Sequence, residues 1–292
     1  MNEPAIQIDN LQVRLADGRM LLRGVSVAVS PGEVHGLVGE SGAGKSMIGK
    51  TILGTLPHGA VIQSGRIMFG GQDLMEMSFD KRRGLMGCDI ALIPQDPLMS
   101  LNPVRRIRRQ MIDLMRLRLG MDRSTALRRA IELLDQVSIH EPERVIDLYP
   151  HELSGGMRQR VLIAMAFAGK PRLIIADEPT TALDVTVQRT VLQVLRAMQQ
   201  QHGSAVLFIT HDLGLVAKLC RTMTVLHAGR VLEQGPTSEV ISAPVHPYTR
   251  ALLASTPRFD RPSSLLQPIP RSLADSLWLE ARTWDHYVGA SI

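Results

Sequence analysis

The chain has 292 residues, of which 45% are hydrophobic and 21% are charged, and its formal net charge is +5. This size suits one large α/β core with a smaller satellite better than two full domains. The two cysteines, Cys88 and Cys220, lack metal-ligand spacing and suit a reducing compartment, so we expect neither disulfides nor a zinc site. The most apolar stretch, 161–169, is too short to cross a bilayer, and no secretion signal is expected. The modest positive charge gives only weak support for an anionic partner.

The first seventy residues have the alternating pattern of β-structure. Residues 5–15 and 21–29 alternate apolar and polar side chains around the turn at 16–19, which predicts an antiparallel hairpin. A buried strand over 34–38 follows, and a short strand is expected over 65–69. These strands predict a β-rich flap on the core of the chain.

A glycine-rich stretch lies between the strand at 34–38 and a predicted helix start. It has the order G-x-x-x-x-G-K-S of a phosphate-binding loop. Its glycines let backbone amides approach a polyphosphate, and the helix N-terminus attracts the anion. A chance glycine-rich turn is the alternative, which the flanking strand and helix disfavour. We expect Lys45 to reach the β- and γ-phosphates, Ser46 to bind Mg²⁺, and the nucleotide to contact Gly39, Glu40, Ser41, Gly42, Ala43, Gly44, Lys45 and Ser46.

The middle of the chain changes from strand to helix. A buried strand over 90–93 stops before Gln95, which therefore lies where open α/β sheets bind ligands. From 103 to 148, apolar residues recur at three- and four-residue intervals, which predicts helices. Four arginines near the start of this section, at 105, 106, 108 and 109, suggest either a phosphate or nucleic-acid patch or a solvated helix face. The solvated face is favoured, because no aromatic residues interleave with the arginines.

Two further groups of residues complete a candidate catalytic site. Ser154, Gly155 and Gly156 precede a helical run, so the serine can cap the helix while the glycines admit an anion. An apolar strand over 173–176 then ends in Asp177 and Glu178. We expect Asp177 to hold Mg²⁺ through water and Glu178 to orient or deprotonate an attacking water.

Two more polar residues follow predicted elements. Asp184 precedes a helix expected over 185–201, and His211 follows a strand expected over 205–210. A lone histidine after a strand is usually structural. Here His211 is the next residue at the end of a strand in a sheet that already carries Lys45, Gln95 and Glu178, which favours a γ-phosphate sensor.

In this order and spacing, the motifs make the chain resemble the ATP-binding subunit of an ABC transporter, from residue 6 to about residue 258. Within that family, residues 93–97, 100–103, the Gly-Gly-Met signature and 246–253 are similar to the oligopeptide, dipeptide and nickel importers. The resemblance implies an α/β fold, in which a P-loop ABC-type nucleotide-binding domain carries an antiparallel β flap and an inserted helical subdomain. The implied domains are an ATPase domain over 1–258, with the helical subdomain at about 103–155, and a tail over 259–292.

The resemblance also implies roles and partners. ATP and Mg²⁺ are the implied cofactors, with Ser46, Gln95 and Asp177 at the metal and Glu178, His211 and Gln95 as catalytic residues. Ser154, Gly155 and Gly156 complete the ATP site of a second cassette in a head-to-tail pair, and Asp184 couples the two sites. The helical section with the Gln95 loop docks a two-subunit membrane permease at the cytoplasmic face of the bacterial inner membrane, where the chain is peripheral. A solute-binding protein is an indirect partner, and no nucleic acid is expected.

Some features leave alternatives open. Met157 replaces the more usual glutamine and favours a heterodimer with a similar cassette, with a homodimer as the competing outcome. No aromatic residue at 12–15 offers itself to adenine, so Leu15 is only a candidate contact. Residues 267–292 contain no cysteine, so we expect no iron–sulfur cluster in a tail that either packs on the domain or is extended or disordered.

Two other functions are alternatives to solute transport. A soluble ABC-type ATPase acting on nucleic acid or ribosomes would carry a coiled-coil insertion or two cassettes. A regulatory module without turnover would lack Glu178 or His211, and both are present. The sequence therefore predicts an ATPase that powers import of a peptide, nickel or a related small solute.

Overall fold

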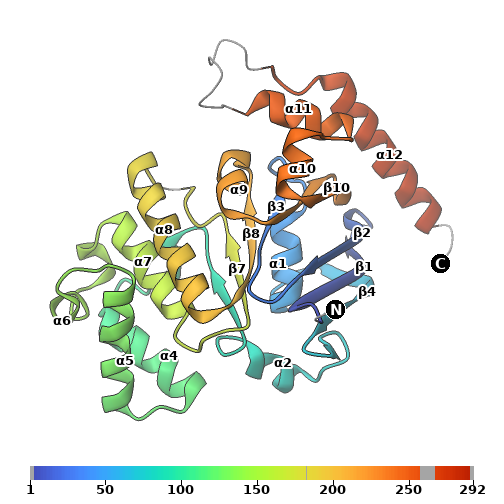
Figure 1. Cartoon of the computed structure of the whole chain (residues 1–292). Coiled ribbons are helices and arrows are strands. Elements are labelled where there is room, and N and C mark those ends of the chain that lie inside the picture. Colours follow the sequence, from blue (N-terminus) through green and yellow to red (C-terminus); the bar gives the residue numbers. More distant parts are fainter. Residues whose placement is uncertain (1–2, 182, 257–266, 290–292) are drawn as a thin grey trace. The chain divides into compact units, whose positions relative to one another are not determined.

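The computed structural model describes residues 3–181, 183–256 and 267–289, with side chains up to Asp285 (Figure 1). Contacts divide the chain into two compact units, residues 1–77 with 207–292, and residues 78–206.

The flap of the first unit is a four-stranded antiparallel sheet in the order β2-β1-β4-β5 (Figure 1). Strand β1 (Ile6–Leu15) pairs with β2 (Met20–Val29) on one side and with β4 (Ala60–Phe69) on the other, and β5 (Gln72–Asp73) extends the sheet beyond β4. The predicted hairpin is confirmed. Strand β4 begins five residues before the predicted 65–69, because pairing with β1 extends as far as Ala60.

The first unit also holds the strand that leads into the glycine-rich loop. Strand β3 (Val34–Val38) runs parallel to β9 (Thr222–His227), and β9 pairs antiparallel with β10 (Arg230–Pro236). On its other side, β3 neighbours β8 (Ala205–Thr210), whose six residues are all buried. Continuous apolar runs of this kind are typical of parallel strands covered on both faces. Two helices complete this core, α1 (Lys45–Leu53) and α9 (Leu213–Leu219).

Three helices form the C-terminal part of the first unit: α10 (Thr237–Ser242), α11 (Pro247–Ser255) and α12 (Arg271–Gly289). Helix α12 contacts β2 and buries Leu277 and Ala281. The tail beyond residue 258 therefore contains a packed helix and is not simply extended. The predicted domain boundary at 258 lies outside the described residues.

The second unit contains two parallel strands, β6 (Ile90–Ile93) and β7 (Leu173–Asp177), which pair from Ile90↔Leu173 to Ile93↔Ala176. Helices α4 (Ile107–Leu119) and α5 (Arg123–Gln136) of this unit pack their predicted apolar faces together. Both α4 and α5 bury residues at three- and four-residue spacing, such as Met111 and Met115, because that spacing lines one face of a helix. The helices are α2 (Phe79–Leu85), α3 (Pro97–Ser100), α4 (Ile107–Leu119), α5 (Arg123–Gln136), α6 (Pro142–Val145), α7 (Gly155–Ala166) and α8 (Val185–His202), with a 3-10 turn over Pro150–Glu152.

Helix α2 was not predicted. It buries none of its residues, so it has no apolar stripe that a periodicity argument could detect. Among the described residues, no helix combines the length and the apolar character that crossing a bilayer requires.

Candidate functional site

The glycine-rich loop joins β3 to α1 in a conformation that its glycines permit. Gly39, Gly42 and Gly44 have φ values of 152°, 84° and 102°, which side chains with a Cβ rarely adopt. A Cβ on Gly39 would lie 2.1 Å from the carbonyl oxygen of Leu226. Helix α1 then begins at Lys45 with no side chain capping its first amides. The loop and the helix start therefore present backbone N–H groups of the kind that bind phosphate.

Lys45 lies where this loop passes into α1, and it is only 5% exposed. Its Nζ donates to the carbonyl oxygens of Gly39 at 2.8 Å and Glu40 at 2.9 Å. Ser46 is the second residue of α1 and is half-buried. A buried ammonium beside several backbone amides makes this loop a strong anion site.

The two strands of the second unit bring two predicted catalytic residues together. Gln95 follows β6 and Glu178 follows β7, and the Gln95 Nε2 donates to the Glu178 Oε2 at 3.3 Å. The Thr181 Oγ1 donates to the same carboxylate oxygen at 2.9 Å. Asp177 is the last residue of β7 and is half-buried. Glu178 has a φ of 45°, in the left-handed region, so the backbone leaves the extended conformation of β7 at this residue.

Thr181 was missed in the sequence. The local sequence signal for it is a hydroxyl three residues after the strand-end carboxylate of Glu178. Its hydrogen bond holds the Glu178 side chain in one orientation.

The signature residues form the start of α7. The Ser154 Oγ accepts from the Met157 N–H at 3.3 Å, which confirms the predicted helix cap. Ser154 and Gly155 are exposed, while Gly156 is buried against α8, where a Cβ would lie 2.4 Å from Val187 Cγ1. This stretch can therefore present a hydroxyl and backbone amides to an anion outside the unit.

Asp184 forms the N-terminal cap of α8. Its carboxylate caps α8 by accepting from the N–H groups of Thr186 at 3.1 Å and Val187 at 3.0 Å. In the first unit, His211 is an exposed residue directly after β8. The predicted site residues thus divide between the units, with the loop and His211 in one, and Gln95, Asp177, Glu178, the signature and Asp184 in the other.

One functional contact had no local signal in the sequence. The hydroxyl of Tyr248, from α11, donates to the Oε2 of Glu40, the second residue of the glycine-rich loop, at 3.0 Å. The two residues are 208 positions apart, so no spacing rule connects them. In the sequence, residues 246–253 carry only a resemblance to the oligopeptide, dipeptide and nickel importers.

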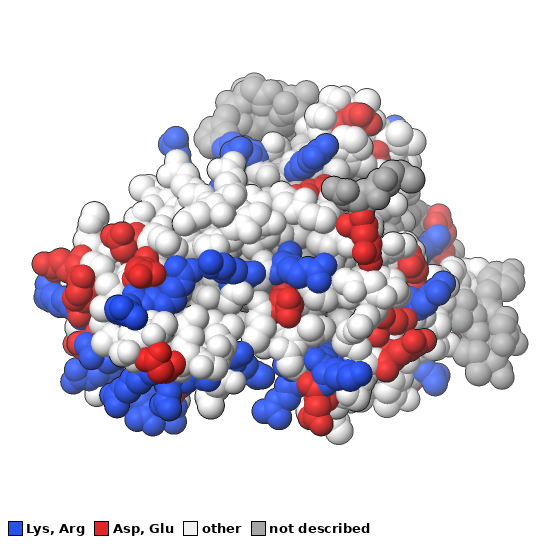
Figure 2. Space-filling view, turned by 60° about the horizontal axis from the view of Figure 1, so that its bottom comes forward, with Lys and Arg blue, Asp and Glu red and all other residues white. Residues whose placement is uncertain are grey.

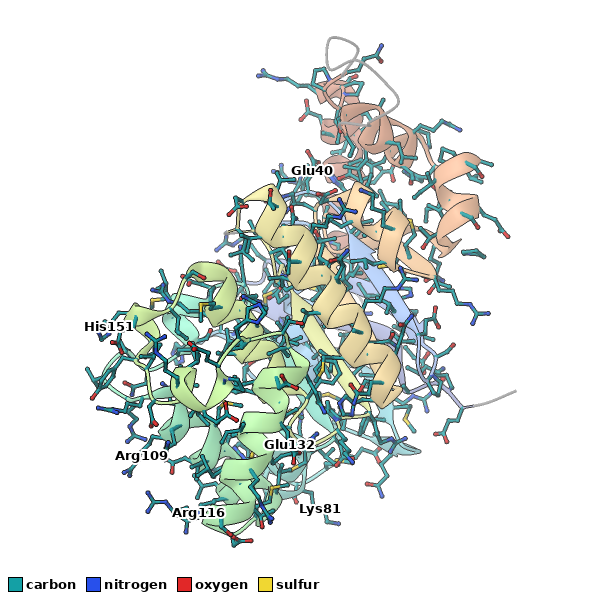
Figure 3. All side chains as sticks on the ribbon, turned by 60° about the vertical axis from the view of Figure 1, so that its left-hand side comes forward. Glu40, Lys81, Arg109, Arg116, Glu132 and His151 are labelled. Carbon is teal, nitrogen blue, oxygen red and sulfur yellow. The ribbon has the colours of Figure 1, made fainter. Side chains whose placement is uncertain are left out.

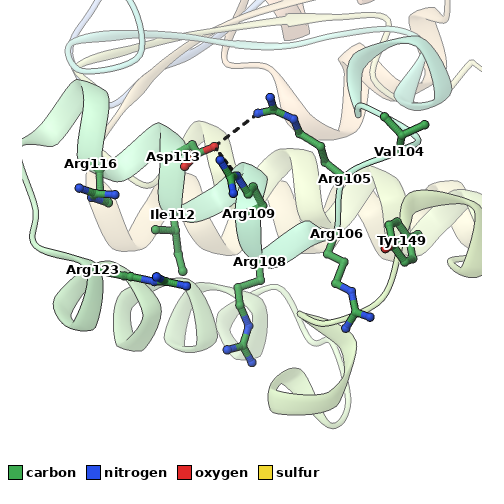
Figure 4. Close-up of a pocket in the computed structure, with 10 residues that line it drawn as sticks. All are labelled: Val104, Arg105, Arg106, Arg108, Arg109, Ile112, Asp113, Arg116, Arg123 and Tyr149. Atoms are coloured by element: carbon green, nitrogen blue, oxygen red, sulfur yellow. Dashed lines mark hydrogen bonds and ion pairs between the residues drawn. The ribbon is translucent and has the colours of Figure 1, made fainter.

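The four arginines near the start of the helical section line a pocket of about 510 Å³ (Figure 4). Arg105 and Arg109 each approach Asp113 at 3.4 Å, Arg108 pairs with Asp147, and Arg106 lies over the Tyr149 ring. Figure 3 shows Arg109 and Arg116 on the outer surface of this region. In the view of Figure 2, positive and negative side chains are interspersed on the molecular face, with positive ones denser at its lower left edge. The arginines are thus largely ion-paired or stacked on the surface of their unit.

Comparisons with known proteins agree with these motifs. The family model described as "ABC transporter" matches residues 22–181, more than half of the chain, and the model "Oligopeptide/dipeptide transporter, C-terminal region" matches residues 232–279. The chain is 44% identical over 268 residues to the dipeptide transport ATP-binding protein DppD of Escherichia coli K12, covering 91% of this chain and 82% of DppD. It is 45% identical over 266 residues to the peptidoglycan transport ATP-binding protein YejF of Agrobacterium fabrum, covering 90% of this chain and 49% of YejF. These relatives do not favour a soluble ATPase that acts on nucleic acid or ribosomes.

Solved structures confirm the predicted fold class. The structure of cbiO1 from Clostridium perfringens, described as part of the ABC transporter complex cbiONQ, has a TM-score of 0.71 at 27% identity, covering 83% of this chain and 92% of cbiO1. A dimeric structure of MJ0796, described as a bacterial ABC transporter cassette, has a TM-score of 0.70 at 25% identity, covering 80% of this chain and 98% of that one. With the phosphate-binding loop, the strand-end carboxylates and the signature in the family's order, the chain belongs to the ATP-binding subunits of ABC transporters.

Proposed function

We propose that this chain hydrolyses ATP to drive the import of a peptide, nickel or a related small solute through a two-subunit membrane permease. The observation that carries the solute class is the match of residues 232–279 to the C-terminal region of oligopeptide and dipeptide transporters. Relatives named for dipeptide and peptide transport extend the likeness along nearly the whole chain. Solute choice then rests with the permease and a solute-binding protein.

The donor set fits a magnesium ion. The Ser46 hydroxyl, the Gln95 amide and the Asp177 carboxylate all offer hard oxygen atoms, which Mg²⁺ prefers. The Gln95 Nε2 already donates to Glu178, which leaves the amide oxygen as its metal-binding atom. When bound, Mg²⁺ neutralises charge on the β- and γ-phosphates.

The hydrolytic step in this proposal is in-line attack of water on the γ-phosphorus, which breaks its bond to the β–γ bridging oxygen and releases ADP and inorganic phosphate. Lys45 and the loop amides hold the β- and γ-phosphate oxygens. Glu178, held by Thr181, takes the proton of the attacking water as general base, and His211 contacts the γ-phosphate.

Two cassettes complete each other's sites in this proposal. The exposed Ser154 hydroxyl and the start of α7 face the γ-phosphate bound on the partner cassette, and Asp184 couples the two sites. Met157, in place of a more usual glutamine, supports a heterodimer with a similar cassette. A homodimer is the competing outcome.

The segment after Gln95 supports a docking surface for the permease. Leu98, Met99 and Val104 are 59%, 86% and 80% exposed, which is a high exposure for three large apolar side chains in one short segment. They lie within ten residues of Gln95, so a docked permease would contact the loop that carries a catalytic residue. Docking of this kind makes the chain a peripheral protein at the cytoplasmic face of the inner membrane.

The test is co-expression with the permease genes. The pair Met99→Glu and Val104→Glu should abolish co-purification with the permease while ATP binding by the chain stays normal, because two charges would be buried in the interface. Phe79→Glu is the matched control, since Phe79 is 76% exposed on α2, outside this segment. Retained co-purification of the double variant would contradict the docking surface. Mass spectrometry of the solute carried by the co-purified binding protein identifies the substrate.

A further inference from the structure

The start of α11 is fixed by several local contacts. The carboxylate of Glu233, on β10, accepts from the N–H groups of Val245 at 2.8 Å and His246 at 3.0 Å. The His246 Nδ1 then caps α11 by accepting from the Tyr248 N–H at 3.1 Å, and Pro247 occupies the first helical position. The His-Pro-Tyr sequence therefore holds the Tyr248 backbone in one place.

Tyr248 points from this fixed backbone into the core and reaches the glycine-rich loop. Its side chain is completely buried, and its hydroxyl donates to the Glu40 Oε2 at 3.0 Å. Burial, followed by the nearby Glu40 charge, raises the pKa of Tyr248 far above its usual range, so the hydroxyl keeps its proton and remains a donor. A hydrogen bond from a tyrosine hydroxyl to a carboxylate is stronger than a hydrogen bond between two neutral groups.

Glu40 connects this bond to the phosphate-binding machinery. Its backbone carbonyl accepts from the Lys45 Nζ at 2.9 Å and from the Ala43 N–H at 3.1 Å. One residue therefore has its side chain held by α11 and its backbone oriented toward the lysine of the loop. A shift of Glu40 would move the carbonyl that positions the Lys45 ammonium.

His227 packs on the Tyr248 ring and also contacts the C-terminal helix α12. The ring centroid of His227, at the end of β9, lies 4.6 Å from that of Tyr248 and 5.9 Å from that of Trp278 on α12. His227 is buried, its Nδ1 lies 3.8 Å from the Glu40 Oε2, and burial lowers its pKa while the Glu40 charge acts in the opposite direction. Helix α12 thus contacts, through Trp278, the histidine that packs on the Tyr248 ring.

We propose that Tyr248 is a positioning residue for ATP binding, because its hydroxyl holds Glu40 and thereby keeps the glycine-rich loop in the phosphate-binding conformation. The inference rests on the proposed function of that loop. A loop with three glycines at positive φ has many alternative conformations, so a fixed contact at Glu40 reduces the entropy lost when phosphate binds. The region matched to the oligopeptide and dipeptide C-terminal model gains a physical connection to the nucleotide site.

The experiment measures ATP affinity of the full chain with a fluorescent ATP analogue, together with KM and kcat of the assembled transporter. Tyr248→Phe keeps the buried ring and removes only the hydroxyl. We expect it to raise the Kd and the KM for ATP by about 3- to 10-fold, with kcat within about twofold of wild type, since part of a charged hydrogen bond is lost from the binding step. Glu40→Ala should have the same effect, and the double variant should show no further loss, because both changes remove one contact.

Three controls separate the outcomes. Glu40→Gln keeps an acceptor for the hydroxyl and should restore most of the affinity lost in Glu40→Ala. Tyr149→Phe removes a hydroxyl from the other unit, where the ring stacks on His151, and should leave the Kd unchanged. Lys45→Ala tests the loop itself.

The results separate a failure of the Tyr248 role from a failure of the proposed nucleotide site. An unchanged Kd in Tyr248→Phe, with binding lost in Lys45→Ala, overturns the positioning role and leaves the nucleotide site intact. Additive losses in the double variant also overturn it. Normal binding in Lys45→Ala overturns the nucleotide site and the inference together.

Discussion

Replacing Glu178 by glutamine isolates the proposed proton transfer from everything else the residue does. Glutamine has the same shape, and its Oε1 can still accept from the Thr181 hydroxyl, now 2.9 Å from the carboxylate. The left-handed backbone at this position, with a φ of 45°, is equally accessible to both residues. ATP binding should therefore stay close to normal, while hydrolysis loses its base and slows by roughly 10²–10⁴-fold, or about 3–5 kcal/mol of barrier.

The assay is steady-state phosphate release by the assembled transporter, with ATP affinity measured in parallel. Thr181→Val is the matched control, because it removes one orienting hydrogen bond and keeps the base. It should slow turnover by only about 3- to 10-fold, the effect of one hydrogen bond of about 0.5–1.5 kcal/mol. Near-normal turnover in Glu178→Gln, or a larger loss in Thr181→Val, would refute the assignment of Glu178 as base.

Three other predictions follow from single contacts. Lys45→Ala should abolish productive ATP binding in a titration with labelled ATP, whereas Lys81→Ala, on α2 (Figure 3), should not; equal losses would mean that the loop is not the phosphate site. Ser154→Arg should block cassette closure and ATPase activity although the P-loop of the same chain is unchanged, and wild-type turnover in this variant would refute the shared site. Native mass spectrometry of the same complex should show a second, different cassette. Asp285→Ala should lower the free energy of unfolding in urea by about 1–3 kcal/mol, because it leaves the buried Arg23 without the carboxylate that lies 2.7 Å away. Glu280→Ala, which removes the more exposed 3.5 Å pair with Arg230, should lower it by under about 1 kcal/mol. Equal effects of the two changes would show that burial of Arg23 is unimportant.

The parts of the site that the sequence predicted are those whose geometry is local. The positive φ values of Gly39, Gly42 and Gly44, the start of α1 at Lys45 and the Ser154 cap all depend on neighbours within a few residues. Strand ends are predictable for a similar reason, since a buried apolar run must stop where the chain returns to solvent, and β6 and β7 end beside Gln95 and Glu178.

The parts that the sequence did not predict depend on tertiary packing. Helix α2 has no buried face, so no periodicity marks it. The early start of β4 depends on pairing with β1, and the packing of α12 depends on Arg23 and His227, far away in the sequence. The contribution of Thr181 to Glu178 depends on how a turn folds back on a strand end. Each of these requires knowing which segments meet, which one sequence does not contain.

The Glu40 contact shows why local motifs alone do not determine how well a phosphate-binding loop works. The glycines that let the loop surround a polyphosphate also leave it free to adopt other conformations, so its order must come from contacts outside the motif. Here the order comes from the Tyr248 hydrogen bond to Glu40 and from the packing of the Tyr248 ring on His227. The backbone at Tyr248 is fixed in turn by the hydrogen bonds of Glu233 and His246 and by Pro247. Because these supports lie in the C-terminal region of the first unit, sequence changes there can alter ATP affinity while every nucleotide-binding motif stays intact.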